Sequence, residues 1–262
     1  MTVYSSGIPL KKQFGQHFLR QQSVVDAMIS KVTVDKNSSV FEIGCGDGFL
    51  TRAILKEAIA RLWIFEIDAH WAEFIQKELP DKRVTVLLEN ILDADFSRFA
   101  QNKPWTLLAN LPYMITFPIL HLLQKHREFL AEGVIMIQEE VAQKLVKQSG
   151  KGYGYPSLFF QHYFELQLMM KISPSAFFPP PKVHSRLVYF KPRATVVLIP
   201  DEEGFWKFIK ICFKQPRRTF RNNMMQTHID LAKIPEKYLL LRAQQMKMED
   251  FLSLWELVRL QK

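Results

Sequence analysis

Short apolar runs recur along the first 190 residues and are separated by polar segments. The runs are Val40–Ile43, Leu62–Ile67, Val84–Leu88, Trp105–Ala109, Val134–Ile137, Leu166–Ile172 and Leu187–Phe190. Their length and their content of β-branched and aromatic residues predict strands. Segments with helical periodicity, such as Leu50, Ala53 and Ile54, lie between the first five runs. The pattern therefore predicts an α/β fold with a mostly parallel sheet covered by helices on both faces.

The pattern changes in the last third of the chain. A Pro-rich turn, and no helix, joins the last two apolar runs, which predicts an antiparallel pair at one edge of the sheet. After Pro192 the apolar residues follow the spacing of several short helices. They are Phe205, Phe208, Ile209 and Cys212, and then Phe251, Leu254, Trp255 and Val258. We therefore expect a sheet domain over residues 1–193 and a small all-helical domain over residues 194–262.

Composition excludes several classes of protein. The chain is 48% hydrophobic and 13% aromatic, which excludes disorder for most of its length. No apolar run is long enough to cross a bilayer, and the start of the chain lacks a continuous apolar block, so we expect neither a membrane span nor a secretory signal. Cys45 and Cys212 lie far apart without CxxC spacing, which predicts no disulfide framework and no metal site. A reducing, cytoplasmic location fits best, and the net charge of +9 favours a polyanionic partner.

The first predicted strand runs directly into a glycine-rich loop, with Gly44, Gly46 and Gly48 in GxGxG spacing before a helix. Glycines allow a sharp turn and close approach of a ligand to main-chain N–H groups. The second strand ends at Glu66, where a carboxylate can accept hydrogen bonds from both hydroxyls of a ribose. These features suit either NAD or S-adenosylmethionine, and the alternative is a plain tight turn with a solvated acid.

Asn90 follows the third predicted strand and has two possible roles. Its amide can contact the adenine edge of a nucleoside cofactor, or it can simply form a turn.

The fourth strand leads into Asn110-Leu111-Pro112-Tyr113, which favours chemistry on an exocyclic amine of a base. Such an amine is a poor nucleophile because its lone pair is delocalised into the ring. The Asn110 side-chain oxygen and the Leu111 carbonyl can each accept one amine hydrogen, which aims the lone pair at a methyl donor. Pro112 fixes the backbone, and Tyr113 offers a face for stacking the base. This assignment favours S-adenosylmethionine over NAD.

Several motifs in the same order resemble the KsgA family of ribosomal RNA adenine dimethyltransferases. They are Lys12-Gln13-Phe14-Gly15-Gln16-His17-Phe18-Leu19, Glu42 to Thr51, Glu66, Asn110 to Tyr113, Tyr153-Gly154, Ser175-Ala176-Phe177-Phe178-Pro179-Pro180-Pro181-Lys182-Val183, and Arg217-Arg218 with Arg221-Asn222. The resemblance implies a Rossmann-like class I methyltransferase sheet that uses S-adenosylmethionine. It also implies dimethylation of two adjacent adenosines near the 3′ end of 16S rRNA during small-subunit maturation, by a monomer.

The resemblance assigns roles to individual residues. It implies that His17 and Leu19 close over the methionine end of the cofactor, that Gly44 and Gly46 support it, and that Glu66 holds the ribose. Asn110 would bind the target amine and the cofactor. Tyr113 would stack on the target adenine, with Phe177 on its other side, although Phe177 before three prolines equally fits a packed corner. The sequence departs from the family pattern at His17, Asn90, Met114, Tyr155 and His184.

A basic cluster predicts the RNA contact. Lys214, Arg217, Arg218 and Arg221 lie within residues 214–221, which contain no acid. Such side chains hold phosphates without reading bases, whereas a charge run is otherwise a solvated helix face. Three alternatives to the small-subunit enzyme stay open: an Erm-like 23S rRNA methyltransferase, a non-catalytic nucleic-acid-binding factor of the same fold, and a dinucleotide-dependent oxidoreductase.

Overall fold

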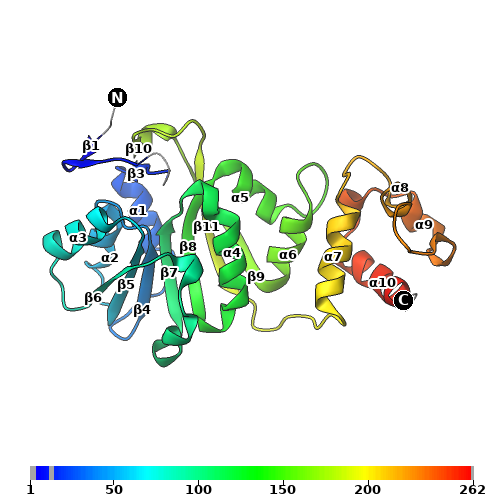
Figure 1. The fold of residues 1–262 in the computed structure, drawn as a ribbon, viewed down its shortest axis with the longest axis horizontal. Coiled ribbons are helices and arrows are strands. Elements are labelled where there is room, and N and C mark those ends of the chain that lie inside the picture. The colour runs from blue at the N-terminus through cyan, green and yellow to red at the C-terminus, as the bar shows by residue number, and fades with distance from the viewer. Residues whose placement is uncertain (1–3, 12–14, 261–262) are drawn as a thin grey trace. The chain divides into compact units, whose positions relative to one another are not determined.

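A seven-stranded mixed sheet forms the centre of the computed structural model, which describes residues 4–11 and 15–260 (Figure 1). Its strand order is β6-β5-β4-β7-β8-β11-β9. The strands are β4 (Ser39–Ile43), β5 (Arg61–Glu66), β6 (Val84–Leu88), β7 (Trp105–Asn110), β8 (Leu130–Gln138), β9 (Phe164–Ile172) and β11 (Ser185–Pro192). The first five are parallel and β11 is antiparallel to β8. The predicted α/β class, all seven strands and the placing of the last two side by side at one edge are confirmed.

Helices connect most of the parallel strands: α2 (Phe49–Ile54) follows β4, α3 (Ala69–Glu78) follows β5, and α4 (Thr116–Lys125) follows β7. Two further helices flank this series, α1 (Gln22–Ile29) before β4 and α5 (Glu139–Val146) after β8. Between β6 and β7 the expected helix is replaced by two 3₁₀ helices, Ile91–Asp93 and Phe96–Asn102. The side chains of Asn90 and Asp95 each accept a hydrogen bond from the amide two residues ahead. Each of these side chains caps the start of a separate 3₁₀ helix, so the segment does not form one continuous α-helix.

The sheet is apolar on both faces, as a parallel sheet between layers must be. On one face, Val40, Leu62 and Leu108 join a core that includes side chains of α1 and α2. On the other face, Trp63, Phe99 and Trp105 pack with ring centroids 4.4–5.1 Å apart. Successive side chains of a strand point to opposite faces of the sheet. In β4, Val40 therefore packs into the first of these layers and Phe41 into the aromatic layer on the other face.

The connection order creates a switch point between β4 and β7. From β4 the chain passes outward to β5 and β6, and it then returns to form β7 on the other side of β4. The connecting loops diverge at this point and leave space at the carboxyl ends of the strands. The glycine loop, Glu66, Asn90 and Asn110 all follow these ends.

The N-terminal segment lies against the same end of the sheet. It forms the short pairs β1 (Tyr4–Ser5) with β2 (Ile8–Pro9) and β3 (Phe18–Leu19) with β10 (Phe177–Phe178). Arg20 pairs with Asp47 at 2.5 Å, and Lys11 pairs with the buried carboxylate of Asp68 at 2.8 Å. These ion pairs tie the segment to the loops after β5 and β4. Its residues Lys12, Gln13 and Phe14 lie outside the described part of the chain.

The chain divides into two compact units. One contains residues 1–142 and 165–192, and the other contains residues 143–164 and 193–262. The second unit holds α6 (Tyr155–Tyr163), α7 (Glu202–Cys212), α8 (Phe220–Met224), α9 (Glu236–Leu239) and α10 (Met248–Arg259). The predicted division at residue 193 stays a prediction. The second compact unit also includes residues 143–164, which precede that boundary, because α6 packs with α7. The Phe159 and Trp206 rings of these two helices lie 4.9 Å apart.

Within residues 4–11 and 15–260, no helix is long and apolar enough to cross a membrane. Over the same ranges, no group of three His, Cys, Asp or Glu side chains is placed to hold a metal ion.

Candidate active site

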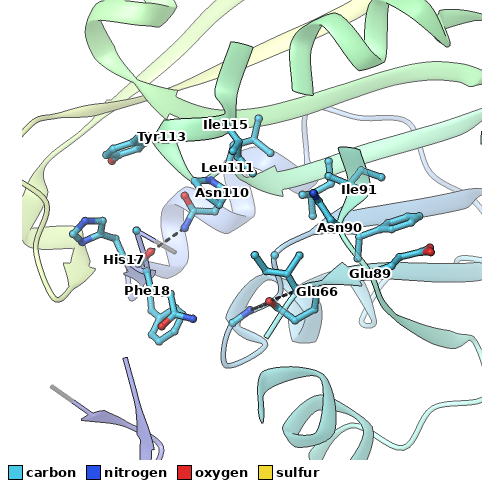
Figure 2. Close-up of a pocket in the computed structure, with 18 residues that line it drawn as sticks. His17, Phe18, Glu66, Glu89, Asn90, Ile91, Asn110, Leu111, Tyr113 and Ile115 are labelled. Carbon is cyan, nitrogen blue, oxygen red and sulfur yellow. Dashed lines mark hydrogen bonds between the residues drawn. The ribbon is translucent and has the colours of Figure 1, made fainter. Parts of the chain in front are cut away.

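A cavity lies at the carboxyl ends of β4, β5, β6 and β7 (Figure 2). Nine residues singled out from the sequence line it: His17, Gly44, Gly46, Glu66, Asn90, Asn110, Leu111, Pro112 and Tyr113. They come from five separate segments of the chain, and the switch point of the sheet brings them together. The structure therefore unites the predicted cofactor loop and the predicted catalytic tetrapeptide in one cavity.

The backbone of the glycine loop forms part of the cavity wall. Gly44 and Gly46 have φ angles of 73° and 51°, in the left-handed region that favours glycine. A β-carbon built on Gly44 would meet no atom within 4 Å, so the cavity reaches the backbone itself. A β-carbon on Gly46 would lie 2.5 Å from the Phe18 ring. Gly44 thus provides room for a ligand, and Gly46 provides room for the ring that closes the cavity.

Glu66 is buried and held at both carboxylate oxygens. Oε1 accepts hydrogen bonds from the amides of Ile67 and Asp68, both at 2.9 Å, and Oε2 accepts one from Gly46 at 3.4 Å. Burial raises the pKa of Glu66, and these hydrogen bonds oppose the rise. The Cys45 thiol also donates to Oε2, at 3.5 Å. The two contacts of Oε2 are long, and Glu66 lines the cavity, so a ribose hydroxyl could replace them as the donor to this oxygen.

Asn90 caps a turn at the edge of the cavity. Its Oδ1 accepts from the Leu92 amide at 3.1 Å, and its Nδ2 donates to Asp93 at 2.9 Å. Of the two roles expected for Asn90, the turn former is present in the structure. Because Asn90 also lines the cavity, the contact with an adenine edge stays a prediction.

Asn110 has its amide group oriented by the N-terminal segment. Nδ2 donates to the main-chain carbonyl of His17 at 3.0 Å, a bond drawn in Figure 2. Within the described residues, Oδ1 of Asn110 accepts no hydrogen bond from the protein. Leu111 donates its amide to the Met136 carbonyl at 3.1 Å, which joins the tetrapeptide to β8. The loop thus presents an amide oxygen in a fixed orientation at the cavity wall.

Tyr113 and His17 form the side of the cavity nearest to Asn110 (Figure 2). Their rings are stacked with centroids 6.2 Å apart and planes 25° apart. The Tyr113 hydroxyl shares a hydrogen bond of 2.6 Å with Ser185, and burial raises the pKa of Tyr113. Nδ1 of His17 donates to the Pro179 carbonyl at 2.7 Å. Both rings are therefore anchored, and a base could stack beside them without ordering either side chain.

Some predicted site residues lie elsewhere. Leu19 and Phe177 are each 4% exposed, belong to the core beneath the sheet and do not line the cavity. The structure places Phe177 in a packed corner, paired with Leu19 between β3 and β10, and its contact with a target base stays a prediction. Four basic residues of the second unit lie exposed around the start of α8: Lys214, Arg217, Arg218 and Arg221.

Apolar walls of the cavity escaped the sequence reasoning. Phe18, Ile67, Ile91 and Ile115 line it beside the polar residues. Ile91 begins a 3₁₀ helix, and nothing in its type or spacing distinguishes it from a core residue. Phe18 belongs to the Lys12–Leu19 motif, but only the folded chain shows that its ring packs over Gly46 and lines the cavity.

The donor set fits a nucleoside cofactor with a free ribose. The space above Gly44 and the fixed acceptor Glu66 lie on one side of the cavity, and the anchored Asn110 lies on the other. The chain would hold the ribose through Glu66 and pack apolar rings and side chains against the base, including Ile91 and Phe65. No metal is needed for this fit.

Comparison with known proteins gives consistent matches. The family model described as "Ribosomal RNA adenine dimethylase" matches residues 8–258. The "Ribosomal RNA small subunit methyltransferase A" of Chlorobium phaeobacteroides is 32% identical over 253 residues, covering 96% of this chain and 92% of that protein. The protein of the same name from Syntrophotalea carbinolica is 37% identical over 216 residues, covering 82% and 81%.

Two solved structures share the fold. The crystal structure of a dimethyladenosine transferase from Plasmodium falciparum aligns with a TM-score of 0.79 at 20% identity, covering 94% of this chain and 98% of that chain. That of the 23S rRNA methyltransferase ErmE aligns with a TM-score of 0.69 at 19% identity, covering 92% and 99%. At these identities the alignments establish the architecture of the sheet and the helices that follow it.

Proposed function

The chain belongs to the ribosomal RNA adenine dimethylase family, and on that premise we propose how it acts and on what. It is a ribosomal RNA adenine dimethyltransferase that uses S-adenosylmethionine. Its substrate is the small-subunit RNA, and its targets are the exocyclic amines of two adjacent adenosines near the 3′ end of 16S rRNA. The RNA is modified during maturation of the small subunit, in the cytoplasm, by a monomer.

One observation carries this proposal, namely the orientation of the Asn110 amide. Because the amide nitrogen donates to the His17 carbonyl, the amide oxygen is left to accept a hydrogen bond from a ligand in the cavity. A ligand amine that gives one hydrogen to Asn110 and another to the Leu111 carbonyl is held with its lone pair directed away from both. This is positioning and electrostatic catalysis, without a covalent intermediate.

The remaining residues divide the binding work. S-adenosylmethionine supplies an electrophilic methyl group when bound. Gly44 and Gly46 give it space, and Glu66 accepts from its ribose hydroxyls. Tyr113 gives the target adenine a stacking surface that Ser185 keeps in place. The exposed cluster of Lys214, Arg217, Arg218 and Arg221 contacts phosphates and positions the RNA.

The test is transfer of labelled methyl groups from S-adenosylmethionine to unmethylated small ribosomal subunits, with naked 23S rRNA in parallel, followed by mapping of the modified nucleotides. We expect two dimethylated neighbouring adenosines near the 3′ end of 16S rRNA. Label on 23S rRNA would instead make the chain an Erm-like enzyme. Absence of transfer to either RNA, with cofactor and RNA both bound, would favour a non-catalytic binding factor.

A further inference from the structure

We propose that Phe178 is a stacking site for the nucleotide next to the target adenosine, so that the enzyme holds two consecutive bases of its substrate. The proposal rests on the function proposed above and names a contact outside the cavity. It concerns a single-stranded stretch of RNA whose target base occupies the site beside Tyr113.

Phe178 lies two contacts away from Tyr113. The Tyr113 ring stacks against His17, and Nδ1 of His17 is hydrogen-bonded to the carbonyl of Pro179, the residue that follows Phe178. Phe178 itself pairs with Phe18 between β10 and β3, and Phe18 lines the cavity. Phe178 is therefore linked to Tyr113 through Pro179 and His17, and its strand partner Phe18 belongs to the cavity wall, which places Phe178 next to the site of the target base.

The local backbone forces the Phe178 ring outward. Successive residues of a strand point to opposite faces, and here Phe177 is 4% exposed whereas Phe178 is 44% exposed. Three prolines follow, and pairing with β3 precedes them, so the backbone is held on both sides. An exposed aromatic ring on a rigid segment loses little conformational entropy when it binds a base.

The charge around Phe178 suits RNA. The segment from Ser173 to Ser185 contains no acid, and its exposed residues include Lys182 and His184. Stacking on an aromatic ring beside cationic side chains is how proteins hold single-stranded nucleic acid without strong base preference. A protein partner would be expected to bury a larger apolar area, whereas the exposed residues that follow Phe178 in this segment include Lys182 and His184 beside the single aliphatic side chain of Val183.

The experiment places a fluorescent reporter at the proposed contact. Unmethylated small subunits are reassembled with a 16S rRNA whose 3′ segment carries 2-aminopurine beside the target adenosine, on the 5′ side in one preparation and on the 3′ side in another. Full-length enzyme with bound S-adenosylhomocysteine is added and the 2-aminopurine fluorescence is followed, because stacking on an aromatic ring quenches it. The variants are Phe178→Ala, Phe178→Tyr and, as an exposed apolar control in the same unit, Met170→Ala.

We expect the wild-type enzyme to quench one of the two reporters. Phe178→Ala should lose that quenching and raise KM for unmodified subunits about tenfold, while Phe178→Tyr and Met170→Ala behave as wild type. Affinity of Phe178→Ala for S-adenosylmethionine should be unchanged by calorimetry, which separates loss of the contact from misfolding. Quenching by Phe178→Ala equal to wild type, or no quenching by bound wild-type enzyme, would overturn the proposal. Failure of the proposed function would show separately, as a wild-type enzyme that transfers no methyl group to subunits.

Discussion

Asn110 is the residue on which the chemistry depends most directly. Its amide nitrogen is already bonded to the His17 carbonyl, so its oxygen is available to an amine hydrogen without rearrangement. We expect Asn110→Ala to lower kcat by roughly a hundredfold or more, because an acceptor that strengthens in the transition state is lost. Cofactor affinity should fall less.

The comparison is single-turnover methyl transfer together with calorimetric binding of S-adenosylmethionine. Asn102→Ala, in the 3₁₀ segment outside the cavity, serves as the control. Near-normal turnover of Asn110→Ala would contradict the mechanism.

Glu66 makes cofactor binding depend on pH. Because burial raises the pKa of this carboxyl, its neutral form becomes populated at a higher pH than for an exposed glutamate. The neutral form has fewer acceptor sites for ribose hydroxyls, so affinity for S-adenosylmethionine should fall as pH decreases, and the fall should begin above the range of an ordinary carboxyl. Glu66→Gln should weaken binding about tenfold and flatten this dependence.

Calorimetry across pH tests this point, with the exposed Glu73→Gln as a matched control. An affinity that stays constant down to pH 4 would show that Glu66 does not carry the ribose.

The polar half of the site can be predicted from the sequence better than the apolar half. Glu66 and Asn110 could be found because each is a polar residue at the carboxyl end of an apolar strand, which is where an open α/β sheet binds its ligands. Phe18 and Ile91 could not, because an apolar residue beside a cavity has the same pattern as one in the core. The same ambiguity applies to Phe177 and Leu19, whose side chains lie in the core and do not line the cavity, so that their predicted contacts with base and cofactor stay predictions.

At the scale of elements, the turn from β4 to α2 distinguishes two uses of glycine. Gly44→Ala strains a positive φ but meets no neighbour, whereas Gly46→Ala both strains the backbone and clashes with Phe18. We expect Gly44→Ala to cost about 1 kcal/mol of folding free energy and Gly46→Ala about 2–4 kcal/mol. Gly44→Ala should nevertheless impair cofactor binding, since its methyl group enters the cavity.

Chemical denaturation and calorimetric titration of both variants separate these effects. A Gly44→Ala variant with wild-type cofactor affinity would show that the cavity above Gly44 is not used.

The strands of the sheet were predictable, and the short pairs were not. Each of the seven strands contains a short run rich in apolar residues, and in the central strands β4 and β7 burial on both faces makes that run nearly continuous. The pairing of β3 with β10 involves two residues on each side, separated by more than half of the chain, and leaves no periodic signal. The two 3₁₀ helices after β6 were missed because the capping side chains of Asn90 and Asp95 override the propensity of the segment.

At the scale of the whole molecule, the positive charge should appear as salt-dependent RNA binding. Arg218 is exposed in the second unit and lies among three other basic residues of the predicted cluster. Arg218→Ala should weaken binding to small subunits and reduce the slope of log affinity against log salt by about one. Arg259 pairs with Glu256 at 2.5 Å in the same unit, so Arg259→Ala serves as the control and should leave the salt slope unchanged. An unchanged slope in Arg218→Ala would remove this residue from the proposed RNA contact.

A buried acid links stability of the fold to pH. Burial raises the pKa of Glu42 from 4.5 to about 8, although the Thr51 hydroxyl donates to it at 2.7 Å. Between these values the unfolded chain releases the proton and the folded chain keeps it, so the free energy of unfolding falls as pH rises. In Glu42→Gln the carboxyl that titrates is absent, so the free energy of unfolding does not fall with pH for this reason.

We therefore expect Glu42→Gln to exceed wild type in Tm at pH 8, with each 1 kcal/mol raising Tm by roughly 2–4 °C, and the difference to shrink towards pH 4.5. Scanning calorimetry at several pH values measures it, with the exposed Glu78→Gln as the reference. A Tm difference independent of pH would contradict the assignment.

The pairing of β3 with β10 also determines when the site can form during synthesis. Phe18, which closes the cavity against Gly46, is held beside Phe178, and Asn110 is oriented by the neighbouring His17 carbonyl. A nascent chain that has passed the catalytic tetrapeptide therefore still lacks the strand that fixes its N-terminal wall. We therefore expect cofactor binding only after the chain beyond residue 178 has left the ribosomal tunnel, when most of the enzyme has already been made.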